Sequence, residues 1–376
     1  MRRISILVLI LCACLVSAAW GQQPAGKCVN NWSEFHRTNM VRWNPCERVL
    51  NVHNVGSLGL KWRHATGNGL YSSPAVANGV VYIGSDDNNV YALNAKTVAK
   101  LWSYTTGSYV ESSPAVANGV VYIGSDDNNV YALNASTGAK LWSYTTGFYV
   151  ESSPAVANGV VYIGSYDNNV YALNASTGAK LWSYTTGGFV FSSPAVANGV
   201  VYVGSQDNNL YALNASTGAK LWSYATHNYV DSSPAVANGV VYVGSDDGNV
   251  YALKASTGAL LWSYAISTSV DSSPAVANGV VYVGSNDGNV YALQASTGAK
   301  LWSYATGAME SSPAVANGVV YVGSVDNNDV YALNARTGAR LWRYTTGGLV
   351  FSSPAVANGV VYVGATDFKL YAFGLK

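Results

Sequence analysis

The chain has 376 residues, of which 49% are hydrophobic and only 10% are charged. Its 20 Lys and Arg nearly balance its 19 Asp and Glu, and no basic run occurs, which argues against a nucleic-acid-binding protein. The abundance of apolar and aromatic residues, with 28 Tyr and 11 Trp, excludes an intrinsically disordered chain.

Residues 1–21 are predicted to be a secretory signal peptide. Two arginines follow Met1, and residues 4–16 form an apolar run that is too short for an ordinary membrane-spanning helix. We expect cleavage after Ala19 or Gly21, which would export the protein to the periplasm or out of the cell. The alternative is an outer-membrane lipoprotein with its lipid on Cys14, because the Leu-Cys-Ala-Cys stretch that ends there weakly resembles a lipobox.

Two cysteines follow the signal peptide, Cys28 and Cys46. An even pair in an exported protein predicts a disulfide bond. It would close a loop of about 19 residues and contribute about 3 kcal/mol in the chain-entropy model. We therefore predict that residues 22–57 form a disulfide-pinned N-terminal extension. Two free thiols are the alternative.

One repeat fills the rest of the chain. The sequence Ser-Ser-Pro-Ala-Val begins at positions 72, 112, 152, 192, 232, 272, 311 and 352, at steps of 40 residues except for one of 39 and one of 41. Eight tryptophans share this spacing: Trp62, Trp102, Trp142, Trp182, Trp222, Trp262, Trp302 and Trp342. Such a period indicates a stacked or radial array of small structural units.

Each unit is predicted to contain four short strands. In residues 112–146, Asn118-Gly119 separates the Ser-Ser-Pro-Ala-Val strand from a second strand rich in Val and Tyr. Asn-Gly between apolar runs favours a two-residue hairpin, because both turn residues need a positive φ. An Asp-Asn-Asn turn and an Ala-Ser-Thr-Gly turn then bound a third strand, and a fourth strand carries Trp142. No segment shows helical periodicity.

Eight units of four antiparallel strands predict an all-β fold, an eight-bladed β-propeller over residues 58–376. Proline lacks a ladder donor, so the Ser-Ser-Pro-Ala-Val strand is expected innermost, with its free edge toward the axis, and the Trp strand outermost. The last unit, residues 352–373, lacks a Trp strand, whereas residues 58–64 form an extra one. We expect this N-terminal strand to complete the last blade and close the ring. An open solenoid is the alternative.

Residues 119–142 resemble the PQQ-like repeat. This repeat occurs in quinoprotein dehydrogenases, which bind pyrroloquinoline quinone (PQQ), and in the non-enzymatic propeller subunit of the bacterial outer-membrane β-barrel assembly machinery. The tryptophan-docking motif of such propellers is matched by Ala135, Thr137, Gly138 and Trp142. The resemblance implies that the eight tryptophans dock neighbouring blades. Val98 replaces the motif's glycine in the first unit, so a different turn is expected there.

Differences between the units concentrate in two connections. One is the link from the outer strand to the next inner strand, and the other is the turn between the second and third strands. In a four-stranded meander both lie at the same end of the strands, so one face of the disc should carry a binding site. Drift on exposed loops would give the same pattern. Four aromatic residues of the links would stack on a ligand or pack the links onto the blades: Tyr109, Tyr149, Phe189 and Tyr229.

The residue before Ser-Ser is acidic in five units. These candidate rim residues are Glu111, Glu151, Asp231, Asp271 and Glu310. If they face the axis, their like charges repel one another, raise their pKa values and attract a cation or a basic ligand. A carboxylate cage would suit Ca²⁺. Solvated acids around a wide channel are the alternative.

The Asp-rich turns at 86–89, 126–129 and 246–249 also suggest calcium, although Asp, Asn and Gly are the residues that any tight turn needs.

Two classes of function remain. A quinoprotein dehydrogenase would need cationic groups for a cofactor with three carboxylates, and also a Ca²⁺ cage. The variable links contain no Lys or Arg, the adjacent-cysteine disulfide of those enzymes is absent, and the loops are minimal. We therefore expect no catalytic residues, and predict a non-catalytic binding or assembly scaffold, plausibly monomeric, for a protein or glycan partner. A dehydrogenase that uses PQQ and calcium is the alternative.

Overall fold

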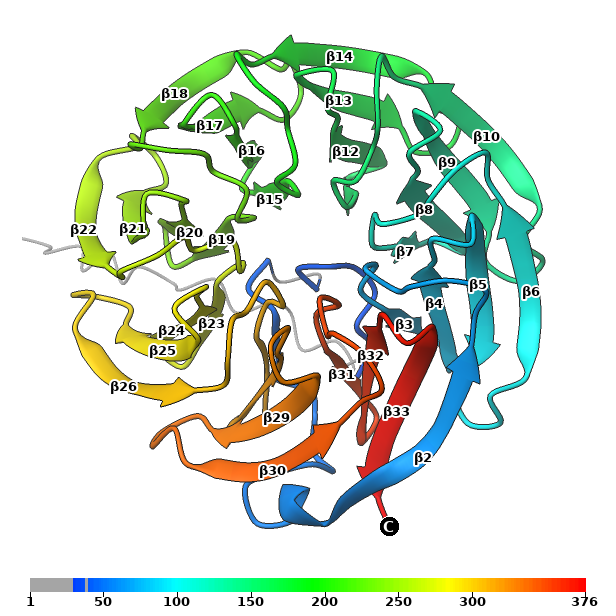
Figure 1. Cartoon of the computed structure of the whole chain (residues 1–376). Coiled ribbons are helices and arrows are strands. Elements are labelled where there is room, and N and C mark those ends of the chain that lie inside the picture. Colours follow the sequence, from blue (N-terminus) through cyan, green and yellow to red (C-terminus); the bar gives the residue numbers. More distant parts are fainter. Residues whose placement is uncertain (1–29, 38–39) are drawn as a thin grey trace, which may run out of the picture.

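The computed structural model describes residues 30–37 and 40–376, which form a ring of eight antiparallel sheets around a central axis (Figure 1). The predicted all-β, eight-bladed propeller is confirmed. Among the described residues, no helix is long and apolar enough to cross a membrane. The predicted signal peptide, Cys14 and Cys28 lie outside the described residues.

Strands occupy equivalent places in every blade, with the Ser-Ser-Pro-Ala-Val strand innermost and the Trp strand outermost, as predicted (Figure 1). The inner strands are β3 (Ala75–Ala77), β7 (Ala115–Ala117), β11 (Ala155–Ala157), β15 (Ala195–Ala197), β19 (Ala235–Ala237), β23 (Ala275–Ala277), β27 (Ala314–Ala316) and β31 (Ala355–Ala357). The second strands are β4 (Val80–Gly84), β8 (Val120–Gly124), β12 (Val160–Gly164), β16 (Val200–Ser205), β20 (Val240–Gly244), β24 (Val280–Gly284), β28 (Val319–Gly323) and β32 (Val360–Ala365). The third strands are β5 (Asn89–Asn94), β9 (Asn129–Asn134), β13 (Asn169–Asn174), β17 (Asn209–Asn214), β21 (Asn249–Lys254), β25 (Asn289–Gln294), β29 (Asp329–Asn334) and β33 (Lys369–Leu375). The outer strands are β6 (Lys100–Thr105), β10 (Lys140–Thr145), β14 (Lys180–Thr185), β18 (Lys220–Ala225), β22 (Leu260–Ala265), β26 (Lys300–Ala305), β30 (Arg340–Thr345) and β2 (Leu58–Ala65).

The N-terminal strand closes the ring. A short 3-10 helix, η1 (Val55–Ser57), leads into β2, which pairs antiparallel with the C-terminal strand β33 from Leu58↔Leu375 to Ala65↔Lys369. In Figure 1 the blue β2 lies beside the red β33. The eighth blade therefore has the order β31-β32-β33-β2, and the predicted closure is confirmed.

Local chemistry explains how each blade turns and how its outer edge is protected. Asn118 and Gly119 have φ values of 51° and 78°, as a two-residue hairpin requires. In β10 the register skips Leu141, because Lys140 pairs with Leu133 and Trp142 pairs with Ala132. The same irregularity recurs in the other outer strands. A bulge of this kind interrupts the outer edge and reduces its ability to pair with another chain.

Blades are joined by the tryptophans, as the motif implied. The Trp102 indole N–H donates to the carbonyl of Ala135 in the next blade at 2.9 Å, and the Tyr82 hydroxyl donates to the same carbonyl at 3.1 Å. Gly138 covers the indole so closely that an added Cβ would lie 2.7 Å from Trp102 Cδ2. All eight tryptophans donate in this way across a blade junction. At the last junction Trp342 donates to Leu58, which replaces the missing turn of the eighth blade.

Val98 occupies the position of Gly138 in the first blade, but the turn there is not different, contrary to our expectation. Val98 has a φ of 59°, and its N–H bonds the Asn94 carbonyl at 2.9 Å, as Gly138 bonds Asn134 at 2.8 Å. A β-branched residue is strained in this left-handed region. The surrounding turn and the docked Trp62 therefore hold Val98 in a conformation that its side chain disfavours.

We predict that Val98→Gly stabilises the protein by about 0.5–1 kcal/mol, since the relief of left-handed strain exceeds the extra chain entropy that glycine loses on folding. Chemical denaturation would measure the change. Gly138→Val in the next blade is the matched control and should be destabilising, because its side chain would also collide with Trp102. If the Val98→Gly variant is no more stable than the wild type, the conclusion that Val98 is strained is wrong.

The described part of the N-terminal extension lies in the middle of the ring around β1 and then passes to the outer edge, where η1 leads into β2 (Figure 1). Its strand β1 (Trp43–Asn44) joins the inner strand β27 in parallel, which makes the seventh sheet five-stranded. Elsewhere the segment contacts the remaining inner strands one after another. The contacts are Trp32 with Val76, Ser33 with Val116, Glu34 with Val156, His36 with Ser193, Met40 with Val236, Val41 with Val276, Arg42 with Val315 and Asn44 with Val356. The inner edges that we expected to be free thus receive hydrogen bonds from the extension, although only β27 pairs with one of its strands.

Arg42 anchors the extension near the axis. It is fully buried, and its guanidinium donates to the carbonyls of Pro313 at 2.9 Å and Pro354 at 3.2 Å. It also donates to Phe35 and, at 3.4 Å, to Ser312. Burial lowers its pKa to about 9, so it remains charged at neutral pH. Cys46 is disulfide-bonded, but its predicted pairing with Cys28 stays a prediction, because Cys28 lies outside the described residues.

Replacing Arg42 with Met should destabilise the protein by about 2–4 kcal/mol, because several buried carbonyls would lose their donor. The exposed Arg48, substituted in the same way, is the control and should change stability by less than about 0.5 kcal/mol. Both values come from denaturant titration. Equal effects of the two substitutions would show that the buried guanidinium does not hold the extension in place.

Candidate functional site

The two variable connections meet on one face of the ring, as predicted. Each second turn contacts the links on both sides of its blade, because the Asp126 N–H bonds the carbonyl of Tyr109 in the link that enters the blade at 3.0 Å, and the N–H of Val150 in the link that leaves it bonds the Ser125 carbonyl at 3.3 Å. We call this side the variable face, defined by residues 106–111 and 125–128 and their equivalents in the other blades. Sequence differences between blades are therefore presented together on one side of the disc.

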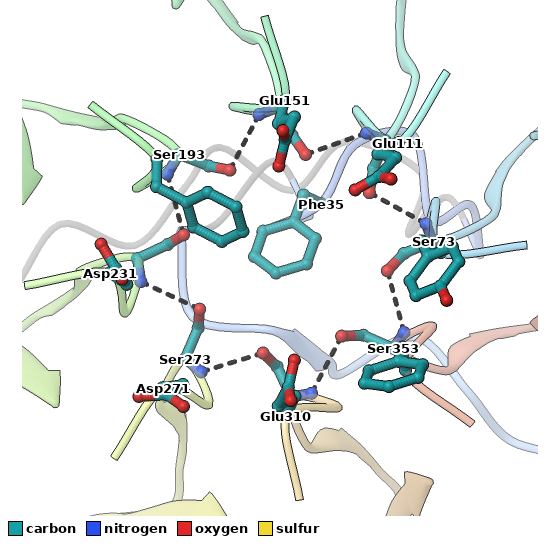
Figure 2. A pocket seen from close by; sticks show the side chains of 17 residues that line it. Phe35, Ser73, Glu111, Glu151, Ser193, Asp231, Asp271, Ser273, Glu310 and Ser353 are labelled. Atoms are coloured by element: carbon teal, nitrogen blue, oxygen red, sulfur yellow. Dashed lines mark hydrogen bonds between the residues drawn. The ribbon is translucent and has the colours of Figure 1, made fainter. Parts of the chain in front are cut away.

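The residues that precede Ser-Ser surround the propeller axis on this face. Together with the second serine of each pair and Phe35, they line a cavity of about 300 Å³, which we call the axial cup. Its rim is formed by Tyr71, Glu111, Glu151, Phe191, Asp231, Asp271, Glu310 and Phe351. Figure 2 shows the carboxylates around the opening, with Phe35 at the centre. All five acids proposed from the sequence thus lie at the predicted inner rim.

A closed ring of serines forms the wall of the cup below the rim. The Ser73 N–H donates to Ser113 Oγ at 2.9 Å, and the pattern continues through all eight blades until the Ser353 N–H donates to Ser73 Oγ (Figure 2). These serines are only 3–6% exposed. Each hydroxyl oxygen accepts one bond within the ring, and no acceptor for its own proton is found among residues 30–37 and 40–376. The wall therefore offers eight buried hydroxyl groups to whatever enters.

The extension forms the floor of the cup. Phe35 lies across the axis, and the Arg42 guanidinium carbon is 4.4 Å from the centre of its ring. Arg42 is committed to main-chain carbonyls and does not line the cup. Its positive charge lies beneath the cup and offsets only part of the charge of the five rim carboxylates.

Three further carboxylates interact electrostatically with the rim: Asp86, Asp126 and Asp246, from the second turns. Burial, followed by repulsion from Glu151, Asp86 and Asp126, raises the pKa of Glu111 to about 8. Burial and neighbouring carboxylates likewise raise the pKa of Asp126 to about 7 and that of Asp86 to about 6. These three positions vary between the units, but their contact with the rim was not predicted from the sequence. The signal was their place on the same face.

Neutral partners hold other rim carboxylates in position. The Tyr166 hydroxyl donates to Glu151 at 2.7 Å, Gln206 Nε2 donates to Asp231 at 3.1 Å, and Asn286 Nδ2 donates to Asp271 at 2.8 Å. Each partner again comes from a second turn. One buried oxygen remains without a partner in each of five acids near the rim: Asp86, Asp126, Asp231, Asp246 and Asp271. Buried acceptors of this kind call for a donor that the described chain does not supply.

The aromatic residues of the links point outward from the variable face. Tyr109, Tyr149, Phe189 and Tyr229 are 39–47% exposed. The adjacent valines, such as Val110 and Val150, are fully buried and pack the links onto the blades. Tyr149 stacks on Phe148 and Phe189 stacks on Tyr166, with 4.3 and 5.2 Å between the ring centres. The four aromatic residues belong to the consecutive links before β7, β11, β15 and β19, so they occupy one arc of the variable face outside the lining of the axial cup.

The Asp-rich turns have a structural role. Asp127 accepts bonds from the N–H groups of Gly107 at 2.6 Å and Asn129 at 3.0 Å, and from the Tyr131 hydroxyl at 2.6 Å. Both of its oxygens are thus engaged within the protein, and equivalent contacts recur in other blades. Within residues 30–37 and 40–376, no group of three or more His, Cys, Asp or Glu side chains is arranged to hold a metal ion.

The ring of PQQ-like repeats and its axial cup define the class of protein. The family model described as outer membrane protein assembly factor BamB matches residues 52–148, 145–230, 226–313 and 306–376. The chain therefore belongs to this family.

Individual relatives are more distant. BamB from Moraxella catarrhalis has a TM-score of 0.74 at 20% identity, with 84% of this chain and 99% of that chain covered. The quinohemoprotein alcohol dehydrogenase from Comamonas testosteroni has a TM-score of 0.80 at 16% identity, with 93% and 81% covered. Lupanine 17-hydroxylase [cytochrome c] from a Pseudomonas species is 34% identical over 86 residues, which span 22% of this chain and 12% of that enzyme. The two structural likenesses show the fold alone.

We predict that Glu111→Gln/Asp126→Asn stabilises the protein at pH 8.5 but hardly at pH 4.5. Raised pKa values mean that the folded protein binds more protons than the unfolded chain between about pH 4 and pH 8. Wild-type stability should therefore fall as pH rises through this window, and the variant should fall less. Melting temperatures at both pH values test this. Burial also raises the pKa of Glu34 to about 7, but both proteins contain Glu34. Its effect therefore cancels in the difference between their melting temperatures. Parallel pH profiles would contradict the repulsion at the rim.

Proposed function

We propose that the protein is an exported, non-catalytic scaffold that binds a positively charged protein partner on its variable face. One observation carries this proposal. The axial cup is lined by five carboxylates, eight serines and four aromatic rings, with no Lys, Arg or His among its lining residues. Such a surface attracts cations and repels anions.

The distribution of charge over the disc supports this orientation. The acidic groups of the blades lie at the variable end of the strands, where Lys369 and Arg343 are already paired with Asp367 and Asp329. Six outer strands begin at the opposite end with a basic residue, namely Lys100, Lys140, Lys180, Lys220, Lys300 and Arg340. Opposite charges on the two faces would orient a basic partner toward the variable face during its approach.

The exposed aromatic rings support a protein partner in particular. Tyrosine and phenylalanine provide large contact areas at little cost in side-chain entropy, and aromatic residues are enriched at protein interfaces. Tyr109, Tyr149 and Tyr229 also carry a hydroxyl that remains available to a partner's polar groups. Membership of the BamB family agrees with an assembly role, but fold and family do not by themselves establish a partner.

A PQQ-dependent dehydrogenase is the second candidate, favoured by the likeness to quinohemoprotein alcohol dehydrogenases. The residues on the axis do not fit that cofactor. PQQ carries three carboxylates and would need cationic partners, whereas the lining of the axial cup is acidic. Nor do the rim carboxylates converge in a way that would hold Ca²⁺, within the part of the chain that the structure describes. We therefore propose that the family fold is used here without the quinone.

Calorimetric titration of the mature protein with PQQ, with and without Ca²⁺, tests this proposal. We expect no measurable heat of binding in either case, because the acidic cup repels the anionic quinone. Micromolar or tighter binding that requires Ca²⁺ would overturn the scaffold and support the dehydrogenase. The thermal unfolding transition of the same sample serves as the control that the protein is folded.

A further inference from the structure

We infer that the axial cup is a receptor for a single guanidinium or alkylammonium group. This inference rests on the proposed function, since the natural source of the group would be an Arg or Lys side chain of the partner docked on the variable face. A small organic cation free in solution would present the same chemistry. The cup would then be part of the interface, beside the aromatic rings of four consecutive links.

The dimensions of the cup favour a side chain over a larger ligand. Its volume of about 300 Å³ lies at the lower end of ordinary small-molecule pockets. Phe35 blocks passage along the axis, so a ligand can enter only from the variable face (Figure 2). A folded partner cannot penetrate this space, but one extended side chain from it can.

The unsatisfied acceptors of the cup match a donor-rich cation. One oxygen each of Asp231 and Asp271 is buried and without a partner, and both residues line the cup. Asp86, which is only 9% exposed and raises the pKa of Glu111, has a further such oxygen. A guanidinium has five N–H donors and an ammonium has three. Charge-assisted bonds to carboxylates are among the strongest hydrogen bonds in proteins.

Hydrogen bonds from neighbouring side chains fix the orientation of the carboxylates of Asp231 and Asp271, which would make the cup selective for a cation. Gln206 and Asn286 already orient Asp231 and Asp271, so each carboxylate is held in place. The other oxygen of Asp231 is open, whereas Asp271 also contacts the carboxyl of Asp246, a contact between two acids that a cation would replace. Below them, the eight serine hydroxyls are 94–97% buried and line the cup without an observed acceptor for their protons. A hydroxyl oxygen with one bond from an N–H group retains a lone pair for a further donor. The wall is therefore preorganised before a ligand arrives.

Aromatic rings complete the environment of a cation. Tyr71, Phe191 and Phe351 interrupt the acidic rim, and Tyr71 lies 4.9 Å from Phe351 between ring centres. Phe35 at the floor already interacts with the guanidinium of Arg42 at 4.4 Å from its centre. An organic cation gains both from such rings and from the carboxylates. A bare divalent ion would instead require oxygen ligands that converge, which the rim does not provide.

Binding of a cation should release protons from the rim. The acidic groups around the cup are the five rim acids, Asp86, Asp126 and Asp246 from the second turns, and Glu34 from the extension. The extension also places the cation of Arg42 beneath the cup, together with His36, which stays neutral because burial lowers its pKa to about 3. Burial and the neighbouring Asp271 raise the pKa of Asp246 to about 8. A cation favours the ionised carboxylates, so affinity should increase as pH rises from 5.5 to 8.5.

The test is calorimetric titration of the mature protein at pH 8 with the blocked peptide Gly-Arg-Gly, and with blocked Gly-Gln-Gly as the neutral control. We expect one Arg peptide to bind per protein, affinity to fall at least about tenfold at pH 5.5, and no binding of the Gln peptide. The variant Asp231→Asn/Asp271→Asn should weaken binding at least about tenfold. Asp326→Asn removes a charge from an exposed turn of the same face, outside the cup, and should change affinity less than about twofold.

Several outcomes would overturn the inference. These are equal binding of the two peptides, an affinity unchanged in Asp231→Asn/Asp271→Asn, or micromolar binding of Ca²⁺ in place of the peptide. Melting curves show whether the variant is folded. Titration with methylguanidine distinguishes a side chain of a partner from a free organic cation. If the peptide binds more tightly than methylguanidine, the natural ligand is a protein side chain. If the two bind equally, the natural ligand is a free cation. Failure of the peptide to bind would overturn the cation receptor but not the proposed scaffold function. Only the titration with PQQ decides between a scaffold and a dehydrogenase.

Discussion

The structure depends on one contact, the hydrogen bond between a tryptophan indole and a carbonyl of the next blade. A four-stranded blade has two apolar faces and is stable only between neighbours. The bond from Trp102 to Ala135, with Gly138 packed on the indole, sets the distance and angle between blades, and it recurs around the ring. The serines on the axis form a second circular set of bonds at a smaller radius. Because both sets close, the rim residues above the serines are held in fixed positions, which the acidic cup requires.

The cup combines mutual repulsion with rigidity. Like charges at a flexible site would move apart, but here each carboxylate is attached to an inner strand that cannot move without breaking the serine ring. The protein thereby tolerates the raised pKa of Asp231 and an unpartnered oxygen on each of Asp231 and Asp271. The repulsion between these carboxylates lowers the folding stability of the protein. A bound cation would restore part of that stability. The mutual repulsion of carboxylates is therefore confined to the axial cup, whereas the tryptophan contacts between the blades stabilise the ring.

Much of this was predictable from the sequence because the repeats are regular. Asn118-Gly119 and the tryptophan spacing predicted the strands and the ring, and the place of Glu111 before the innermost strand predicted the rim. Asp126 was not joined to the rim, because that step needs the bond between Asp126 and Tyr109 of adjoining blades. The extension was also beyond prediction. Its contacts, such as Ser33 with Val116 and Val41 with Val276, fall on single residues in different blades and leave no periodic pattern. At Val98 the motif was a poor guide, since tertiary contacts impose the turn on an unsuitable residue.

The path of the extension has a consequence for the evolution of the ring. Near-identical units are easily gained or lost by unequal recombination, and a propeller built from them alone has no internal reference for how many blades it should contain. Here the segment from Trp32 to Asn44 contacts the blades in turn, each with a different residue. In a ring with one unit more or fewer, the contacts between this segment and the inner strands would no longer align. The extension therefore fits a ring of eight blades, because a different residue of it contacts each blade.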